Sequence, residues 1–143
     1  MSFKREYNCR AKAIVTEAYI FPDFKQGELP AMKFYSPLVV WDTGAEHTSI
    51  SMDVVKALQL KPKHTMPIAV LGGNTEVNIY DVAIGLPNGK LYHNVEVFGA
   101  EIDEYAALIG MDLITETDFV ITNKDNKTTF QFRTPSEGGI ELK

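Results

Sequence analysis

The sequence predicts a mainly β fold with one or two short helices. Two observations carry this prediction: the apolar residues fall in short runs, several of which alternate with period 2, and Gly, Asn and Pro turn signals separate the runs. Only two stretches favour a helix, and both are short. With 143 residues, 45% hydrophobic and 23% charged, the chain suits a single domain over residues 1–143.

The first part of the chain predicts two strands and then a helix. Residues 11–20 are rich in β-branched and small apolar residues, and residues 34–41 end in an apolar run typical of a buried strand. Ser51 is placed to N-cap a short helix, and Pro62 prevents that helix from continuing. The apolar residues of this helix share one face: Val54, Val55 and Leu58.

The middle of the chain predicts two consecutive hairpins. Residues 67–71 and 75–86 read as the two arms of the first hairpin, with a turn at Gly72-Gly73-Asn74. Asn88-Gly89 is a strong turn signal, and residues 91–98 form the strand that follows it.

The last part of the chain predicts a second short helix and a final hairpin. The helix is expected from Asp112, and residues 119–122 and 128–132 flank a polar turn at 123–127. The whole sequence therefore predicts about seven to nine strands.

Charge and composition exclude several classes of partner and cofactor. The formal net charge of −5 disfavours nucleic acid or an anionic membrane as the main partner. Cys9 is the single cysteine, so no intrachain disulfide is expected, and the three histidines lack metal-ligand spacing, so neither a metal nor a cofactor is expected. Without an apolar leader or a long apolar run, we expect a cytoplasmic protein without membrane segments.

One segment combines residue types that suit catalysis: Val39-Val40-Trp41-Asp42-Thr43-Gly44-Ala45. An apolar strand would hold the Asp42 carboxylate rigidly in weakly polar surroundings. The Thr43 hydroxyl would bond across a neighbouring copy of the loop, and Gly44, lacking Cβ, would let another backbone approach. The tripeptide alone equally fits a loop aspartate that caps a turn.

Two further segments favour the catalytic interpretation of Asp42 over the turn cap. Residues 45–50 continue the motif as Ala-Glu-His-Thr-Ser-Ile, and residues 107–114, Ala-Leu-Ile-Gly-Met-Asp-Leu-Ile, place Gly110 after apolar residues and before a short helix. The hairpin with Gly72-Gly73 at its turn lies between them. In this order the segments resemble the retropepsin-like aspartic proteases, the family of the retroviral protease, over about residues 34–133.

The resemblance implies a closed β-barrel of the acid-protease type, acting as a homodimer without a cofactor. Asp42 would be the catalytic carboxylate, and Gly110 would let its segment pass behind the active-site loop. Glu46 and Met111 stand where retroviral members usually have Asp and Arg, so the carboxylate–arginine tie of those proteins cannot form between them. The substrate-binding residues would be Thr43, Gly44, Ala45, Glu46, Leu71, Gly72, Gly73 and Gly110.

The resulting hypothesis is an aspartic endopeptidase that hydrolyses peptides or proteins with a water activated between two Asp42 carboxylates. Residues 1–30 and 136–143 lie outside the match and are candidates for the dimer interface, where Ile140 and Leu142 alternate with charged residues. One alternative is a proteolytically inactive dimeric module for binding or regulation. Another is a monomeric β-barrel that encloses a small molecule and in which Asp42 is only structural.

Overall fold

The computed structural model describes all 143 residues, which form ten strands and two short helices. The mainly β prediction is confirmed, but the expected strand count is too low. β1 was not expected, and β4 and β8 have three residues each, too few to show a period in the sequence. The elements are β1 (Ser2–Glu6), β2 (Ile14–Pro22), β3 (Phe34–Trp41), β4 (Ser49–Ser51), α1 (Met52–Ala57), β5 (His64–Val70), β6 (Gly73–Gly85), β7 (Leu91–Ala100), β8 (Ala107–Ile109), α2 (Met111–Ile114), β9 (Asp118–Lys124) and β10 (Lys127–Arg133).

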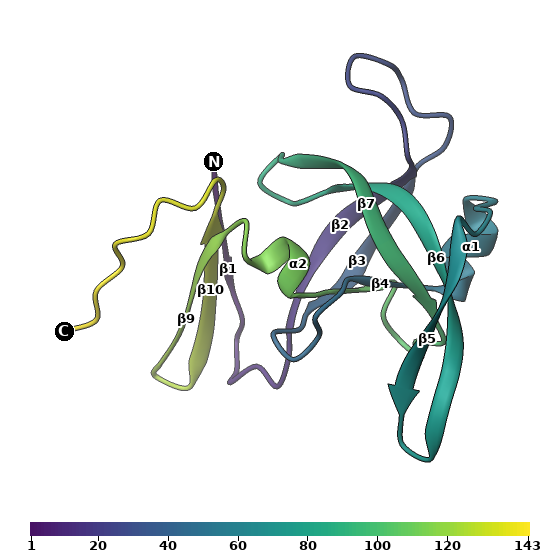
Figure 1. Ribbon diagram of the computed structural model, residues 1–143. Coiled ribbons are helices and arrows are strands. Elements are labelled where there is room, and N and C mark those ends of the chain that lie inside the picture. The colour runs from purple at the N-terminus through teal and green to yellow at the C-terminus, as the bar shows by residue number, and fades with distance from the viewer.

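Six strands close into a barrel. Their order is β2-β3-β8-β4-β7-β6, and β6 pairs again with β2, so the ring has no open edge. β3 runs parallel to β8, and β4 runs parallel to β7. β5 pairs only with β6, and the β5–β6 hairpin therefore projects beyond the barrel (Figure 1).

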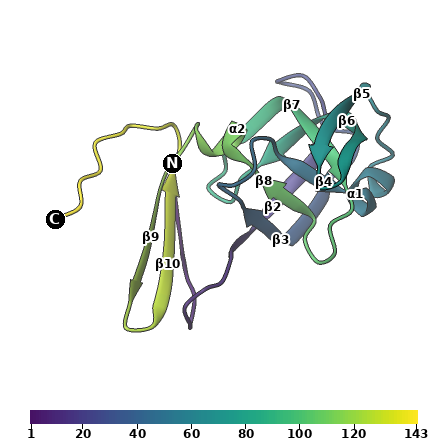
Figure 2. The same cartoon turned by 60° about the horizontal axis from the view of Figure 1, so that its bottom comes forward.

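The two ends of the chain meet in a separate sheet of order β1-β10-β9, which we call the terminal sheet. Its strands are antiparallel, with Phe3 opposite Phe132 and Phe132 opposite Phe119. α2 lies between this sheet and the barrel (Figure 2). Residues 136–143, which follow β10, form no strand in the single chain.

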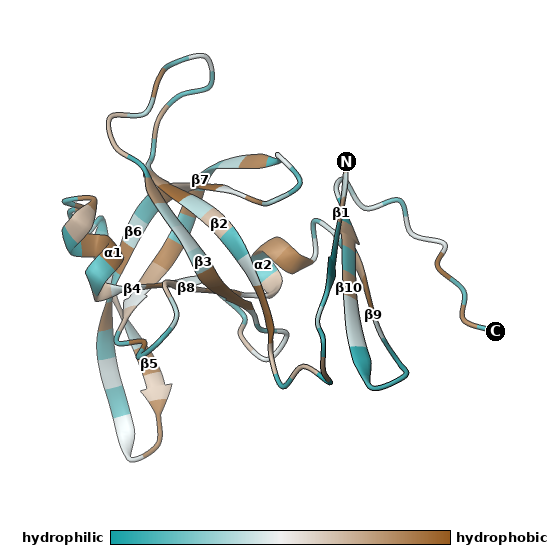
Figure 3. Cartoon of the chain, turned by 180° about the vertical axis from the view of Figure 1, so that it is seen from behind, coloured by the Kyte–Doolittle hydropathy of each residue, from teal (hydrophilic) through white to brown (hydrophobic).

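Trp41, the last residue of β3, joins the two sheets. Its indole Nε1 donates a hydrogen bond of 3.0 Å to the buried hydroxyl of Thr16 in the barrel. Its ring lies 4.9 Å from that of Phe132 and 5.2 Å from that of Phe130, between centroids. Hydrophobic residues accordingly concentrate along the end of β3, β8 and α2 (Figure 3). Burial of such aromatic side chains stabilises the fold by roughly 1.5–3 kcal/mol each.

Several predicted boundaries are confirmed and others shift. Ser51 caps α1 as expected, its hydroxyl accepting a hydrogen bond from the amide of Val54 at 3.3 Å. β5 begins at His64 rather than at residue 67, and the hairpin turn precedes Gly73. α2 begins at Met111, one position before Asp112. Neither helix has the length and apolar character needed to cross a membrane.

Candidate active site

Asp42 follows β3 directly, and the barrel fixes its backbone. Its amide donates a hydrogen bond of 2.8 Å to the carbonyl of Ile109, which extends the parallel β3–β8 pairing by one step. Its side-chain Oδ1 accepts a hydrogen bond of 2.9 Å from the amide of Gly44. Asp42 is half-buried, whereas Thr43 and Gly44 are exposed. The carboxylate therefore sits on a rigid base beside a loop that is open to another molecule.

Gly110 lies directly behind this loop. A Cβ on Gly110 would come within 2.6 Å of the backbone carbon of His47 and 2.9 Å of the carbonyl oxygen of Ala45. The next two amides hold the loop from the same side: Met111 donates to Ala45 at 2.7 Å, and Asp112 donates to Glu46 at 3.2 Å. Glycine is thus required here by close packing of two backbones.

Thr48 and Asp112 complete the support of the loop, and neither is among the site residues that the sequence predicts. Asp112 Oδ1 accepts from the Thr48 hydroxyl at 2.7 Å, and Asp112 Oδ2 accepts from the Thr48 amide at 3.0 Å. The Thr48 hydroxyl oxygen in turn accepts from the amide of Gly110 at 3.1 Å. The available signal was an aspartate two positions after Gly110, together with a threonine at the end of the Asp-Thr-Gly segment.

The side-chain contact to the loop comes from Thr48 and Asp112 and not from Glu46 or Met111. Glu46 is exposed and forms no ion pair, and Met111, whose side chain is uncharged, is half-buried. Their backbones instead form the hydrogen bonds that connect the loop to the start of α2. A carboxylate on α2, rather than one in the loop, therefore carries the side-chain contact.

The remaining predicted residues divide into two groups. Ala45 is half-buried in the loop, whereas Gly110 is buried behind it and is not exposed for the predicted contact with a substrate. Leu71, Gly72 and Gly73 form the tip of the β5–β6 hairpin, where Gly72 has φ +93° and Gly73 has φ +141°, values that favour glycine. The Leu71 side chain is fully exposed, and no hydrogen bond joins the tip to the Asp42 loop.

An open hollow of about 420 Å³ adjoins the Asp42 loop. His47, from the loop, packs against Phe98 of β7 with tilted rings whose centroids lie 4.8 Å apart. The β5–β6 hairpin contributes Met66 and Ile79, which belong to its apolar face because alternate residues of a strand share a face. This face of the hairpin carries Met66, Ile68, Val70, Val77 and Ile79.

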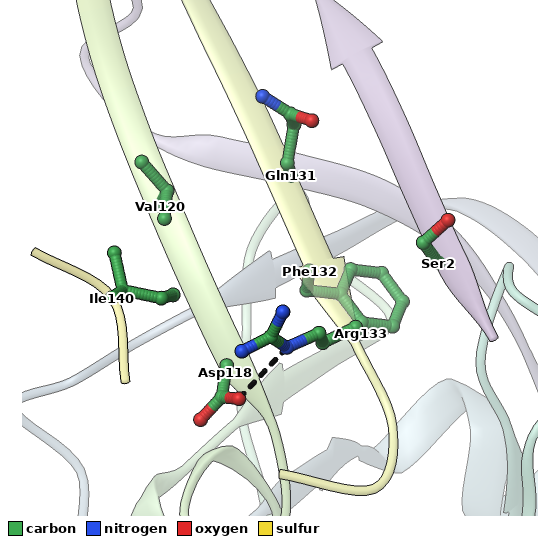
Figure 4. A pocket seen from close by; sticks show the side chains of 7 residues that line it. All are labelled: Ser2, Asp118, Val120, Gln131, Phe132, Arg133 and Ile140. Carbon is green, nitrogen blue, oxygen red and sulfur yellow. Dashed lines mark hydrogen bonds and ion pairs between the residues drawn. The ribbon is translucent and has the colours of Figure 1, made fainter. Parts of the chain in front are cut away.

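Two further hollows lie elsewhere. One, of about 260 Å³, is on the terminal sheet, where Ile140 of the tail lies near Val120 and Asp118 bonds to Arg133 at 2.9 Å (Figure 4). The other, of about 500 Å³, lies among aromatic residues of β2 and β3 such as Tyr19 and Tyr35. No three histidine, cysteine or carboxylate side chains converge as a metal site would require.

Comparison with known proteins finds similarity in structure and none in sequence families. No family model matches the chain, and no curated protein matches it. A solved structure described as a retropepsin-like aspartic protease from Rickettsia conorii is 14% identical, with a TM-score of 0.47 and coverage of 92% of each chain. EIAV protease, solved in complex with the inhibitor HBY-793, is 22% identical, with a TM-score of 0.48 and coverage of 76% of this chain and 89% of its own. The likeness at these identities concerns the fold alone.

Proposed function

We propose that this chain is one subunit of a homodimeric aspartic endopeptidase in which Asp42 is the catalytic residue. The observation that carries the proposal is the way in which Asp42 is held. Its backbone is fixed to β8, while its carboxylate adjoins the exposed residues Thr43 and Gly44. A general base or acid requires this combination of a held position and access for the reacting molecule.

The chemistry requires two carboxylates, and the chain has a single Asp-Thr-Gly segment. A second copy related by a two-fold axis would bring its own Asp42 beside the first. Two adjacent carboxylates do not both ionise readily, so they share one proton. The ionised member would take a proton from a bound water that attacks the peptide carbonyl, and the protonated member would donate to the carbonyl oxygen. The pair would titrate as a unit.

The β5–β6 hairpin would cover the substrate in this proposal. Its apolar face carries the half-buried Ile68 and Val77 and the exposed Met66 and Val70. A mobile hairpin that closes over a peptide would cover these residues and exclude water from the reacting carbonyl. The glycines at its tip have a second explanation, since any hairpin turn favours them.

The decisive variant is Asp42→Asn. The amide keeps the size of the side chain and can still accept from the Gly44 amide, but it cannot exchange the required protons. We expect the wild-type protein to cleave members of a mixed peptide library and a statine-type peptide to inhibit it. Asp42→Asn should reduce cleavage by at least roughly three orders of magnitude while circular dichroism and unfolding temperature stay close to wild type.

Three outcomes would contradict the proposal. A variant that cleaves at a rate near that of the wild type would show that Asp42 is not catalytic. A wild-type dimer that neither cleaves any peptide nor binds the statine-type inhibitor across the pH range would favour the inactive binding module. A monomer with an enclosed ligand would favour the small-molecule barrel.

A further inference from the structure

The hollow beside the Asp42 loop has apolar walls and an acidic rim. Its walls include Met66 and Ile79 of the hairpin and Phe98 of β7. Two carboxylates also line it, those of Glu96 on β7 and Asp112 on α2. Met66 is 39% exposed, so the wall nearest the hairpin is open to an entering side chain. Hollows that combine apolar walls with a few polar or charged side chains, here His47, Asn94, Glu96 and Asp112, are typical of ligand-binding sites.

The charge of Asp112 has no cationic partner. Its side chain accepts hydrogen bonds from neutral donors only, namely the hydroxyl and amide of Thr48 and the amide of Leu113. No lysine, arginine or histidine nitrogen lies within ion-pair distance of it. No cationic side chain therefore pairs with this carboxylate at the wall of the hollow.

Glu96 is only weakly compensated. Its side chain is 55% exposed and lies 3.8 Å from the Lys63 ammonium, which is closer to Asp81, at 3.5 Å. Asp81 lies directly opposite Glu96 across the β6–β7 pair, so the two carboxylates share one lysine. Among the residues that line the hollow, Glu96 and Asp112 are acidic and His47 is the single basic one, whereas Lys63 and Asp81 lie outside the lining.

We infer that this hollow is a substrate subsite that selects a long side chain with a cationic head, arginine or lysine. The aliphatic stem would pack on Met66 and Phe98, and the charged head would reach Glu96 and the field of Asp112. The inference rests on the proposed protease function and names the substrate class of one subsite. An acidic side chain would be repelled, and a short one would leave the apolar walls unfilled.

The test uses a series of statine-type peptides, which bind without being cleaved. Arginine, lysine, norleucine and glutamate are placed in turn at each position two to four residues from the statine, and dissociation constants are measured with the wild-type protein. At one position we expect arginine and lysine to bind roughly two- to five-fold more tightly than norleucine, and glutamate to bind more weakly than norleucine. The preference should shrink in 1 M salt because such rim charges are screened.

Glu96→Gln should remove most of the preference, and Glu101→Gln, a matched change at an exposed residue outside the hollow, should leave it intact. The inference would be overturned if norleucine bound as tightly as arginine and lysine, or more tightly, at every position. It would also be overturned if Glu96→Gln kept the preference unchanged. In either case, cleavage of the peptide library would leave the proposed function standing. Absence of both binding and cleavage would overturn the proposed function and the inference with it.

Discussion

Gly110 is a single residue whose substitution should disturb the candidate active site. Gly110→Ala would place a Cβ against the backbone of Ala45 and His47, which has no flexible end that could move aside. The φ of −95° is open to alanine, so the cost arises from the clash alone. We expect a loss of about 1–3 kcal/mol in the free energy of unfolding, measured with a chemical denaturant, together with reduced peptide cleavage.

Gly85→Ala provides the matched control. A Cβ there meets its nearest neighbour, the Cβ of Tyr19, at 3.5 Å, an ordinary contact distance. Its free energy of unfolding should stay within about 0.5 kcal/mol of the wild-type value. Equal effects of the two substitutions would show that the backbone contact behind the loop is not the cause.

The pH dependence that we expect for the rate of catalysis follows from Ala45. It has no side-chain donor toward the Asp42 pair, so nothing at this position favours the ionised carboxylates, and the shared proton should persist to higher pH. We expect a bell-shaped rate profile with an optimum at roughly pH 5–6.5. In Ala45→Ser a hydroxyl that donates to the pair would stabilise the ionised form and move the profile to lower pH. Full pH–rate curves of both proteins check this, and an unmoved or alkaline-shifted profile in an intact dimer would remove the argument.

At the scale of elements, the terminal sheet holds the start of the tail through Asp118. Its carboxylate accepts from the Ser136 hydroxyl at 2.6 Å, the Glu137 amide at 2.7 Å, the Arg133 guanidinium at 2.9 Å and the Gly138 amide at 2.9 Å. These donors, the Ser136 hydroxyl first, hold the pKa of Asp118 well below its usual range. The ionised carboxylate therefore anchors the tail to β9.

The lowered pKa predicts how this anchoring depends on pH. The stabilisation of the anchored tail by Asp118 is complete above the ordinary carboxyl pKa of about 3.9. It declines as the pH falls below that value toward the lower pKa of the anchored state, because the carboxyl group binds a proton first in the state with the tail released. Hydrogen exchange should therefore show protected amides at Glu137 and Gly138 near pH 6. Asp118→Asn should lose that protection, and the two proteins should converge in strong acid.

Asp125→Asn, in the exposed β9–β10 turn, supplies the control for that experiment. It removes the same charge from the same hairpin without touching the tail, so its exchange pattern should match that of the wild type. Loss of tail protection in both variants would point to a general charge effect and not to the hydrogen bonds of Asp118.

At the scale of the whole molecule, the proposed site is complete only in a dimer. One chain supplies one Asp-Thr-Gly segment, and its exposed Thr43 has no partner within the chain. The terminal sheet offers unpaired outer edges on β1 and β9, and Ile140 and Leu142 of the tail remain 48% and 89% exposed. These are the surfaces at which we expect the second copy to pack.

Dilution tests this expectation directly. Specific activity should fall as the protein concentration passes below the dimer dissociation constant, because the monomer has half of the site. Analytical ultracentrifugation gives that constant independently, and the two midpoints should coincide. Full activity in samples shown to be monomeric would contradict the shared site. A control series with a saturating statine-type peptide should shift the dissociation midpoint to lower concentration.

Local sequence is enough to predict the mainly β class, the Ser51 cap of α1 and the position of Asp42 at a strand end, because each depends on neighbours along the chain. Three features become visible only in the folded chain: the pairing of β2 with β6 that closes the barrel, the short strands β4 and β8, and the hydrogen bond between Thr48 and Asp112. Those features join residues that are distant in the sequence, and neither period nor composition records which distant segment supplies a hydrogen-bonding partner.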